Sequence, residues 1–76
     1  MTLDKHKLDG IPKISSKTLP ASNFEKIMID AGYIITGTAP AQGNRIKKWW
    51  NHSTFSRIEA IYSPDEKTVI TAYHVS

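Results

Sequence analysis

Cysteine is absent from this chain of 76 residues, and its absence removes two common ways of stabilising a small domain. Without thiols the chain has neither a disulfide nor a thiolate metal site. The remaining strong metal ligands are the three histidines, His6, His52 and His74, and no two of them have the spacing of a familiar metal motif. We therefore expect no metal and no cofactor. A single core must hold one domain near the lower size limit.

Long apolar runs are also missing. No segment approaches the roughly 20 apolar residues that a membrane-spanning helix needs. The segment from Met1 to Lys7 lacks the apolar stretch of a secretory signal. We expect a small soluble domain with no membrane partner, which is either a whole short protein or a module excised from a longer one.

Acidic residues are missing from one long stretch. Between Ala31 and Ile58 there is no Asp or Glu, although the net charge of the chain is only +3. The stretch mixes cations with aromatic rings: Arg45, Lys47, Lys48, Trp49, Trp50, His52, Phe55 and Arg57. Because cations attract phosphates and unpaired bases stack on rings, this pattern is typical of a surface for RNA or single-stranded DNA. A merely solvated basic face is the alternative, but tryptophans are uncommon on such a face.

The first third of the chain divides into an arm and a helix. Its Gly, Pro and Ser content predicts that residues 1–21 form an extended arm or linker, with at most a short strand at 11–14, before a compact domain at 22–76. The segment Ser22–Glu25 matches a capping box, and apolar residues then recur at helical spacing up to a glycine. These features predict a helix over about residues 23–31.

The rest of the chain has β patterns. We expect strands at 33–36, 56–62 and 68–75, a loop at 39–44, and a type I turn at 63–67. The segment 45–51 fits either a strand or a short helix. The predicted fold class is therefore α+β, with one helix packed on an antiparallel sheet of three to four strands.

The register of the last hairpin decides which side chains share a face. A three-residue turn centred on Asp65 gathers four apolar residues under the helix: Ile58, Ala60, Ile70 and Ala72. A turn one residue longer would place Thr71 beside Ile58 instead. We prefer the first register because burial of four apolar side chains outweighs the preference of the turn. That register leaves four other residues adjacent on the far face: Arg57, Glu59, Thr71 and Tyr73.

RNA can be cleaved without a metal, and this chain has the residue types required. A general base removes the proton of the 2′-hydroxyl, which attacks phosphorus, while a general acid protonates the leaving 5′-oxygen. Imidazoles titrate near neutrality, arginines bind phosphate, and Thr and Tyr hydroxyls donate to the charged phosphate. The clustered carboxylates of a two-metal nuclease are missing.

His52 is our preferred acid or base because it lies inside the basic aromatic segment; the alternative is a surface or turn-capping histidine. His74 and His6 are less favoured for that role. Arg57 is the expected phosphate clamp, since a strand fixes it. The residues expected to contact RNA are Arg45, Lys47, Lys48 and Trp50. At least one of the two adjacent tryptophans is expected in the core, because so small a domain needs its bulk.

Thr71 and Tyr73, two apart on the last strand with a His and an Arg upstream, resemble the active sites of small bacterial ribonuclease toxins. These toxins have the Barnase–EndoU–colicin–RelE fold or the related pancreatic-ribonuclease-like fold, and many are C-terminal domains of contact-dependent inhibition systems. The resemblance covers roughly residues 22–76. It implies a catalytic His52, a phosphate-binding Arg57, and transition-state support from the Thr-x-Tyr pair. Residues 24–36 also look like the start of toxins of the double-stranded-RNA-binding type, whose Gly-Ser-His signature is missing.

Together these observations predict a ribonuclease toxin of bacterial competition that cleaves tRNA or another structured RNA. The expected catalytic residues are His52, Arg57, Thr71 and Tyr73. Its partners would be RNA and a cognate immunity or antitoxin protein. It would act in the cytoplasm, with delivery inside a larger secreted effector as one route. The alternatives are a non-catalytic module for RNA, single-stranded DNA or an acidic protein, and a small inhibitor or immunity-type protein.

Overall fold

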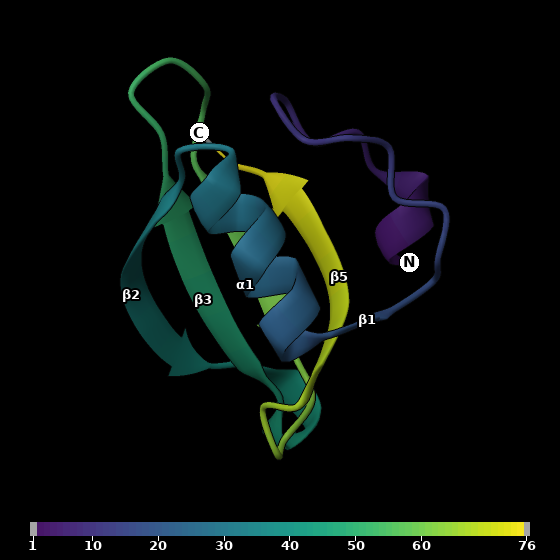
Figure 1. Cartoon of the computed structure of the whole chain (residues 1–76). Coiled ribbons are helices and arrows are strands. Elements are labelled where there is room, and N and C mark those ends of the chain that lie inside the picture. Colours follow the sequence, from purple (N-terminus) through teal and green to yellow (C-terminus); the bar gives the residue numbers. More distant parts are fainter. Residues whose placement is uncertain (1, 76) are drawn as a thin grey trace.

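One helix packs on one face of a five-stranded antiparallel sheet in the computed structural model, which describes residues 2–75. The strand order is β1-β5-β4-β3-β2. Figure 1 shows α1 lying in front of the sheet between β3 and β5. The elements in chain order are η1 (Leu3–Lys5), β1 (Leu19–Pro20), α1 (Ala21–Asp30), β2 (Ile34–Pro40), η2 (Gln42–Asn44), β3 (Ile46–Asn51), β4 (Ile58–Tyr62) and β5 (Thr68–His74), where η marks a short 3₁₀ helix. The predicted α+β class is confirmed, with five strands instead of three to four.

The helix α1 begins two residues earlier than predicted. Its N-cap is Pro20 and Ser22 lies inside the first turn, so the predicted capping box does not form. Glu25 instead accepts a hydrogen bond from the buried Tyr62 hydroxyl at 2.8 Å. The predicted end is confirmed, because Gly32 has a φ of +94° and supplies the left-handed stop. Among the residues described, no helix has the length and apolar character needed to cross a bilayer.

The core lies between α1 and the sheet face that it covers. Phe24 of α1 meets the Trp50 and Tyr62 rings edge-on, with ring centroids 6.2 and 6.4 Å apart. The other buried residues in this layer are Met28, Ile58, Ala60, Val69 and Ala72. Trp50 is 2% exposed, which confirms the expectation of a tryptophan in the core.

The segment 45–51, for which the sequence left two interpretations, is largely strand β3 and pairs with β2. The strand β2 runs through Ala39 and Pro40, where a loop was predicted. Pro40 pairs with Ile46 at the end of an edge strand, a position where the missing proline N–H costs no ladder hydrogen bond. The first hairpin is therefore longer than the sequence indicated.

The last hairpin has the predicted faces but a register two residues away from the predicted one, since a three-residue turn centred on Asp65 would pair Ala60 with Ile70. Ala60 pairs with Ala72, and the Glu66 N–H donates to the Ser63 carbonyl across the predicted turn at 2.8 Å. Beyond Ile61 the register shifts by a bulge, so Tyr62 pairs with Val69. Val69 therefore fills the core where Ile70 was expected, and that detail of the prediction was wrong.

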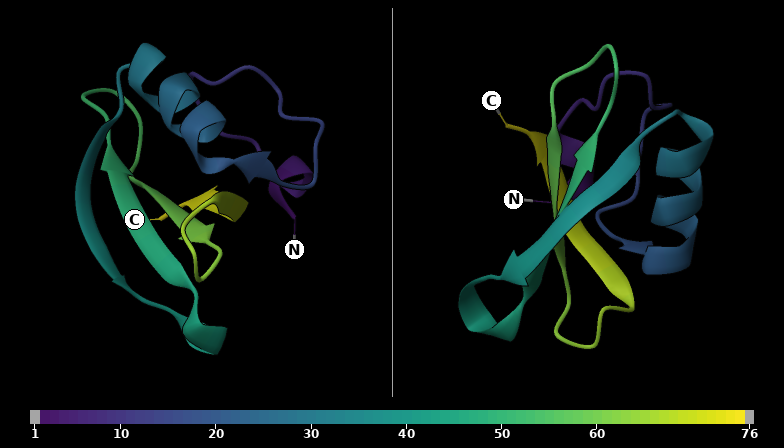
Figure 2. Two further views of the ribbon diagram at one scale, coloured as in Figure 1. Left: turned by 60° about the horizontal axis from the view of Figure 1, so that its bottom comes forward. Right: turned by 90° about the vertical axis from the view of Figure 1, so that its left-hand side faces the viewer.

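The arm packs along the sheet edge at β5. Leu3 is fully buried and Leu8 is 5% exposed, so both belong to the core. Residues Leu19–Pro20 pair with β5 as the short strand β1, while residues 11–14 form no strand. Figure 2 shows the arm looping beside α1 and then feeding into the sheet edge. The arm is thus part of the folded unit and is not an extended linker.

Candidate functional site on the open sheet face

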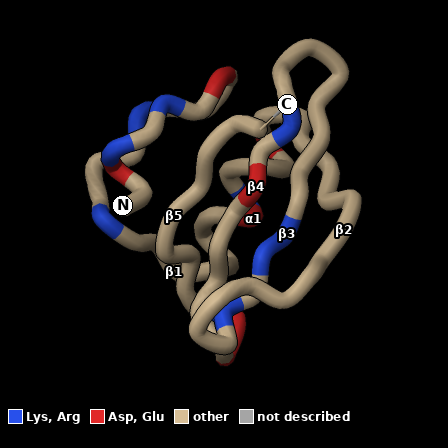
Figure 3. The backbone as a smooth tube through the Cα atoms, turned by 180° about the vertical axis from the view of Figure 1, so that it is seen from behind, with Lys and Arg blue, Asp and Glu red and all other residues tan. Residues whose placement is uncertain are grey.

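The sheet face opposite α1 carries alternate residues of three neighbouring strands. We call it the open face, and it consists of Lys47, Trp49, Glu59, Ile61, Thr71 and Tyr73. Trp49 pairs with Glu59 and Glu59 with Tyr73, so these three side chains cross the sheet in one row. Figure 3 views the molecule from this side, with basic segments on β3 and an acidic segment on β4.

Glu59 is the centre of this row. The Trp49 indole N–H donates to one carboxylate oxygen at 2.9 Å, and the Tyr73 hydroxyl donates to the other oxygen. The hydrogen bond to Glu59, with partial burial, raises the pKa of Tyr73 to about 12. The phenol therefore remains a donor at neutral pH, and the carboxylate is held in one orientation from both sides.

Three cations surround the row. Lys47 and Arg57 both lie over the Trp49 ring, at 5.6 and 5.9 Å from its centroid. Arg45 and Lys47 line a shallow hollow of about 260 Å³ together with Glu59 and Tyr73. Within residues 2–75 none of the three cations forms an ion pair with a carboxylate. Their charges are therefore free to meet a phosphate.

His6 reaches the same face from the arm. Its ring centroid lies 5.6 Å from that of Tyr73, and both rings are half-buried. It is the one histidine among the described residues that contacts a residue of the open face. The arm thus brings an imidazole to the Tyr73 end of the row, next to the hydroxyl that holds the carboxylate.

His52, the preferred catalytic residue from sequence, has a different position. Its Nε2–H donates to the Ala31 carbonyl at 2.9 Å, and its Nδ1 accepts the Thr54 N–H at 2.9 Å. Its ring lies between Tyr33 and Phe55, with both centroid distances 4.7 Å. With both nitrogens occupied, His52 ties the β3–β4 loop to the end of α1. The geometry gives it a structural role.

The structure therefore brings together three of the four expected catalytic residues. Arg57, Thr71 and Tyr73 lie on or beside the open face, and His52 is not with them. The hydroxyl oxygen of Thr71 is buried and has no hydrogen-bond partner. His74 also lies elsewhere, since its ring nitrogens meet the Asp9 N–H and Ser56, each at 2.9 Å.

Two of the four residues expected to bind RNA lie on the helix side of the sheet. Trp50 is buried under α1 and offers no ring to a base. Lys48 is held by Glu66 at 3.0 Å and by Glu25 at 3.9 Å. Its amine also lies 4.5 Å from the Tyr62 ring centroid. Arg45 and Lys47 are the two members of the set that face outward beside Glu59.

The sequence interpretation missed Glu59 and Trp49 as site residues. The site residues were predicted from the stretch without acidic residues, and Glu59 is the first acidic residue after that stretch. The predicted register already placed Glu59 beside Arg57 and Tyr73, and a lone carboxylate among cations was the signal that went unused. Strand alternation separates Trp49 from Trp50, but only after segment 45–51 is known to be a strand.

Comparisons of this chain with protein-family models, with curated proteins and with solved structures found no match.

Proposed function

We propose that this chain is a metal-independent endoribonuclease, acting on tRNA or another structured RNA through the open face. The observation that supports this proposal is Glu59, which two donors fix among three cations that have no ion-pair partner within residues 2–75. A face that only bound RNA would lose affinity through a central carboxylate, because like charges repel. A carboxylate placed beside a bound phosphate is instead suited to accept a proton from the neighbouring 2′-hydroxyl.

Glu59 serves as the general base in this proposal. It takes the 2′-hydroxyl proton, and the 2′-oxygen then forms a bond to phosphorus. Each carboxylate oxygen accepts one hydrogen bond in the protein and retains a further lone pair for that proton. Trp49 and Tyr73 are the positioning residues, because their two donors keep the carboxylate from rotating away.

His6 serves as the general acid, since it borders the row at Tyr73. It gives a proton to the 5′-oxygen as the bond between phosphorus and that oxygen breaks. The products are a 2′,3′-cyclic phosphate and a 5′-hydroxyl, so the step consumes no water. Lys47 and Arg57 supply positive charge to the phosphate as its negative charge increases in the transition state.

A toxin role is part of this proposal. One helix followed by an antiparallel sheet is the layout of the Barnase–EndoU–colicin–RelE toxins that the Thr71 and Tyr73 pattern resembles. The toxin role implies a cognate immunity protein as a partner. The roles differ from those expected from the sequence: Glu59 and His6 take the place of His52, and Tyr73 positions Glu59 instead of donating to the phosphate. Thr71 has no role in the step, because its hydroxyl is buried.

The test is cleavage of a tRNA panel in EDTA, with detection of cyclic phosphate ends. We expect wild-type protein to cleave, and Glu59→Gln to reduce the rate by at least about 100-fold, the usual contribution of a general base. The matched control is Glu25→Gln, which alters the other half-buried glutamate, on the helix side of the sheet. Circular dichroism checks that each variant is folded.

Each outcome separates the catalytic proposal from the alternatives. Loss of cleavage in Glu59→Gln but not in Glu25→Gln supports the proposed base. Equal cleavage by Glu59→Gln and wild type removes Glu59 from the mechanism. RNA that is bound in a salt-sensitive manner and left intact by wild-type protein identifies a binding module and overturns the enzyme proposal.

A further inference from the structure

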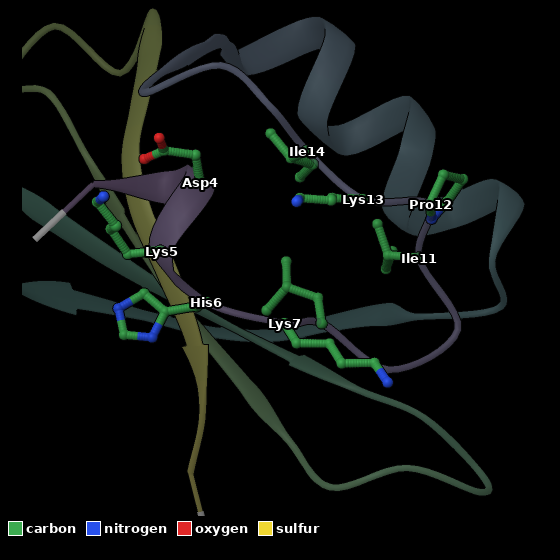
Figure 4. A pocket seen from close by; sticks show the side chains of 9 residues that line it. Asp4, Lys5, His6, Lys7, Ile11, Pro12, Lys13 and Ile14 are labelled. Atoms are coloured by element: carbon green, nitrogen blue, oxygen red, sulfur yellow. The ribbon is translucent and has the colours of Figure 1, made fainter.

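The arm encloses a second hollow, separate from the one beside Glu59. Its volume is about 400 Å³, within the range of roughly 300–1,000 Å³ that is usual for small-molecule pockets. The outgoing limb of the arm, residues 4–8, forms one wall and the returning limb, residues 11–14, forms the other. Figure 4 shows the Ile11, Lys13 and Ile14 side chains directed into the space between the two limbs.

The walls of this hollow combine apolar surface with positive charge. Leu8, Ile11 and Ile14 are buried or half-buried and supply the apolar part. The charged residues in the lining are Asp4, Lys5, Lys7 and Lys13, three cations against one carboxylate. Apolar walls with an excess of cations at the rim suit a flat, weakly polar ring that carries an anionic group.

His6 joins the two hollows. It lines the arm hollow, and its ring contacts Tyr73, which lines the hollow of Glu59. A polynucleotide that lies on the open face therefore passes His6 before it reaches the arm hollow. Because the acid must stand beside the leaving 5′-oxygen, the chain beyond His6 is the part that follows the cleaved bond.

We propose that the arm hollow is a binding subsite for the nucleotide that follows the cleaved phosphodiester, the one that leaves with a free 5′-hydroxyl. This inference rests on the proposed function. Its base would lie against Ile11 and Ile14, and Lys13 would meet its 3′-phosphate, because the scissile phosphate stays with the upstream product. The substrate class is thus RNA with at least one ordered nucleotide downstream of the cut, and the arm contributes to substrate binding as well as to the core.

The direct test is binding of adenosine 3′-monophosphate, followed by NMR of the isoleucine methyl groups of wild-type protein. We expect shifts at Ile11 and Ile14, and no such shifts with inorganic phosphate alone. Lys13→Ala should weaken binding about 10-fold, as expected for loss of one charge-assisted contact. The matched control is Lys17→Ala, an exposed arm lysine outside the lining, which should bind as wild type does.

A kinetic test uses two substrates that differ only downstream of the cut: a dinucleotide that ends in a 3′-phosphate and the methyl ester of the same first nucleoside 3′-phosphate. The wild-type KM should be about 10-fold lower for the dinucleotide, and Lys13→Ala should shrink that ratio while Lys17→Ala keeps it. Equal KM values, or nucleotide shifts at the exposed Ile29 and Ile34 instead of the arm, overturn the subsite. Methyl shifts at the arm with no RNA cleavage would instead overturn the enzyme proposal while showing that the hollow binds nucleotide.

Discussion

Neighbouring residues of β3 have opposite environments, although the sequence makes them look alike. Lys47 and Lys48 are adjacent cations, yet Lys47 lies over Trp49 on the open face while Lys48 is held by Glu66 on the other. Trp49 and Trp50 divide in the same way. Neighbouring residues of a strand lie on opposite faces of the sheet. A run of basic residues on one strand therefore contributes to two surfaces, which have different roles.

This contrast gives a prediction at the residue scale. Lys47→Ala should weaken RNA binding at every sequence and lower the salt dependence by about one phosphate contact, with stability changed by less than about 0.5 kcal/mol. Lys48→Ala should leave RNA binding unchanged and lower the free energy of unfolding by about 1 kcal/mol, because its stem packs on Tyr62 and its amine pairs with Glu66. Filter binding across salt concentrations and urea denaturation measure the two effects. The reverse assignment of effects would contradict this description of β3.

The sequence predicted the site residues only in part, for a physical reason that His52 illustrates. Alternation along strands is a local property, and it placed Thr71 and Tyr73 on one face correctly. Arg57 was expected inside a strand but lies just before β4, with its guanidinium over Trp49. The role of His52 depends on the Ala31 carbonyl, 21 residues away, and no local pattern records that contact. The chemistry of its imidazole favoured His52 as a catalytic residue, but its contact with a residue distant in the sequence gives it a structural role.

At the scale of elements, local sequence signals predicted some bounds of helices and strands correctly and others wrongly. The end of α1 follows from the conformational freedom of Gly32, a property of one residue. Its start does not, because Glu25 bonds to Tyr62 on β4 in preference to capping its own helix. The bulge that brings Val69 into the core likewise depends on the fit between two strands. The bounds of a helix or strand can be predicted from sequence where residues close in the chain determine them.

The arm is the element whose description changed most, and it yields a second prediction. Leu3→Ala and Leu8→Ala should each lower the free energy of unfolding by about 2–4 kcal/mol, the usual cost of deleting a buried leucine side chain. Lys5→Ala, at an exposed position between them, is the control and should cost less than about 0.5 kcal/mol. Urea denaturation measures all three. A free energy that stays unchanged in the leucine variants would return the arm to the status of a linker.

At the scale of the whole molecule, the fold separates two tasks on the two faces of one sheet. The covered face holds the core, and its buried set runs from the arm through α1 to β5. The open face holds the fixed carboxylate and the cations beside it. A chain this small cannot spare a separate layer for function, so each strand supplies both faces by alternation.

The pKa values of all three tyrosines of the chain depend on burial and hydrogen bonds that the fold creates. Their ionisation therefore tests the whole arrangement. Burial raises the pKa of Tyr33, and burial with the hydrogen bond to Glu25 raises the pKa of Tyr62. The bond to Glu59 raises the pKa of Tyr73 to about 12. A phenol whose pKa is higher in the folded state than its unfolded value near 10 adds stability that is full below that value. The added stability is lost as the pH rises through the folded pKa.

We therefore expect no tyrosine to ionise near pH 10, about the ordinary pKa of the phenol, while the protein remains folded. Tyrosinate absorbance should rise only at higher pH, and for Tyr33 and Tyr62 together with the loss of circular dichroism. Tyr73→Phe should remove the component near pH 12 without changing the other two, because its hydroxyl bonds only to Glu59 on the open face. Absorbance and circular dichroism recorded along one alkaline titration measure both events. A full tyrosine ionised near pH 10 in folded protein would mean that at least one of these three hydroxyls lacks the partner or the burial assigned to it.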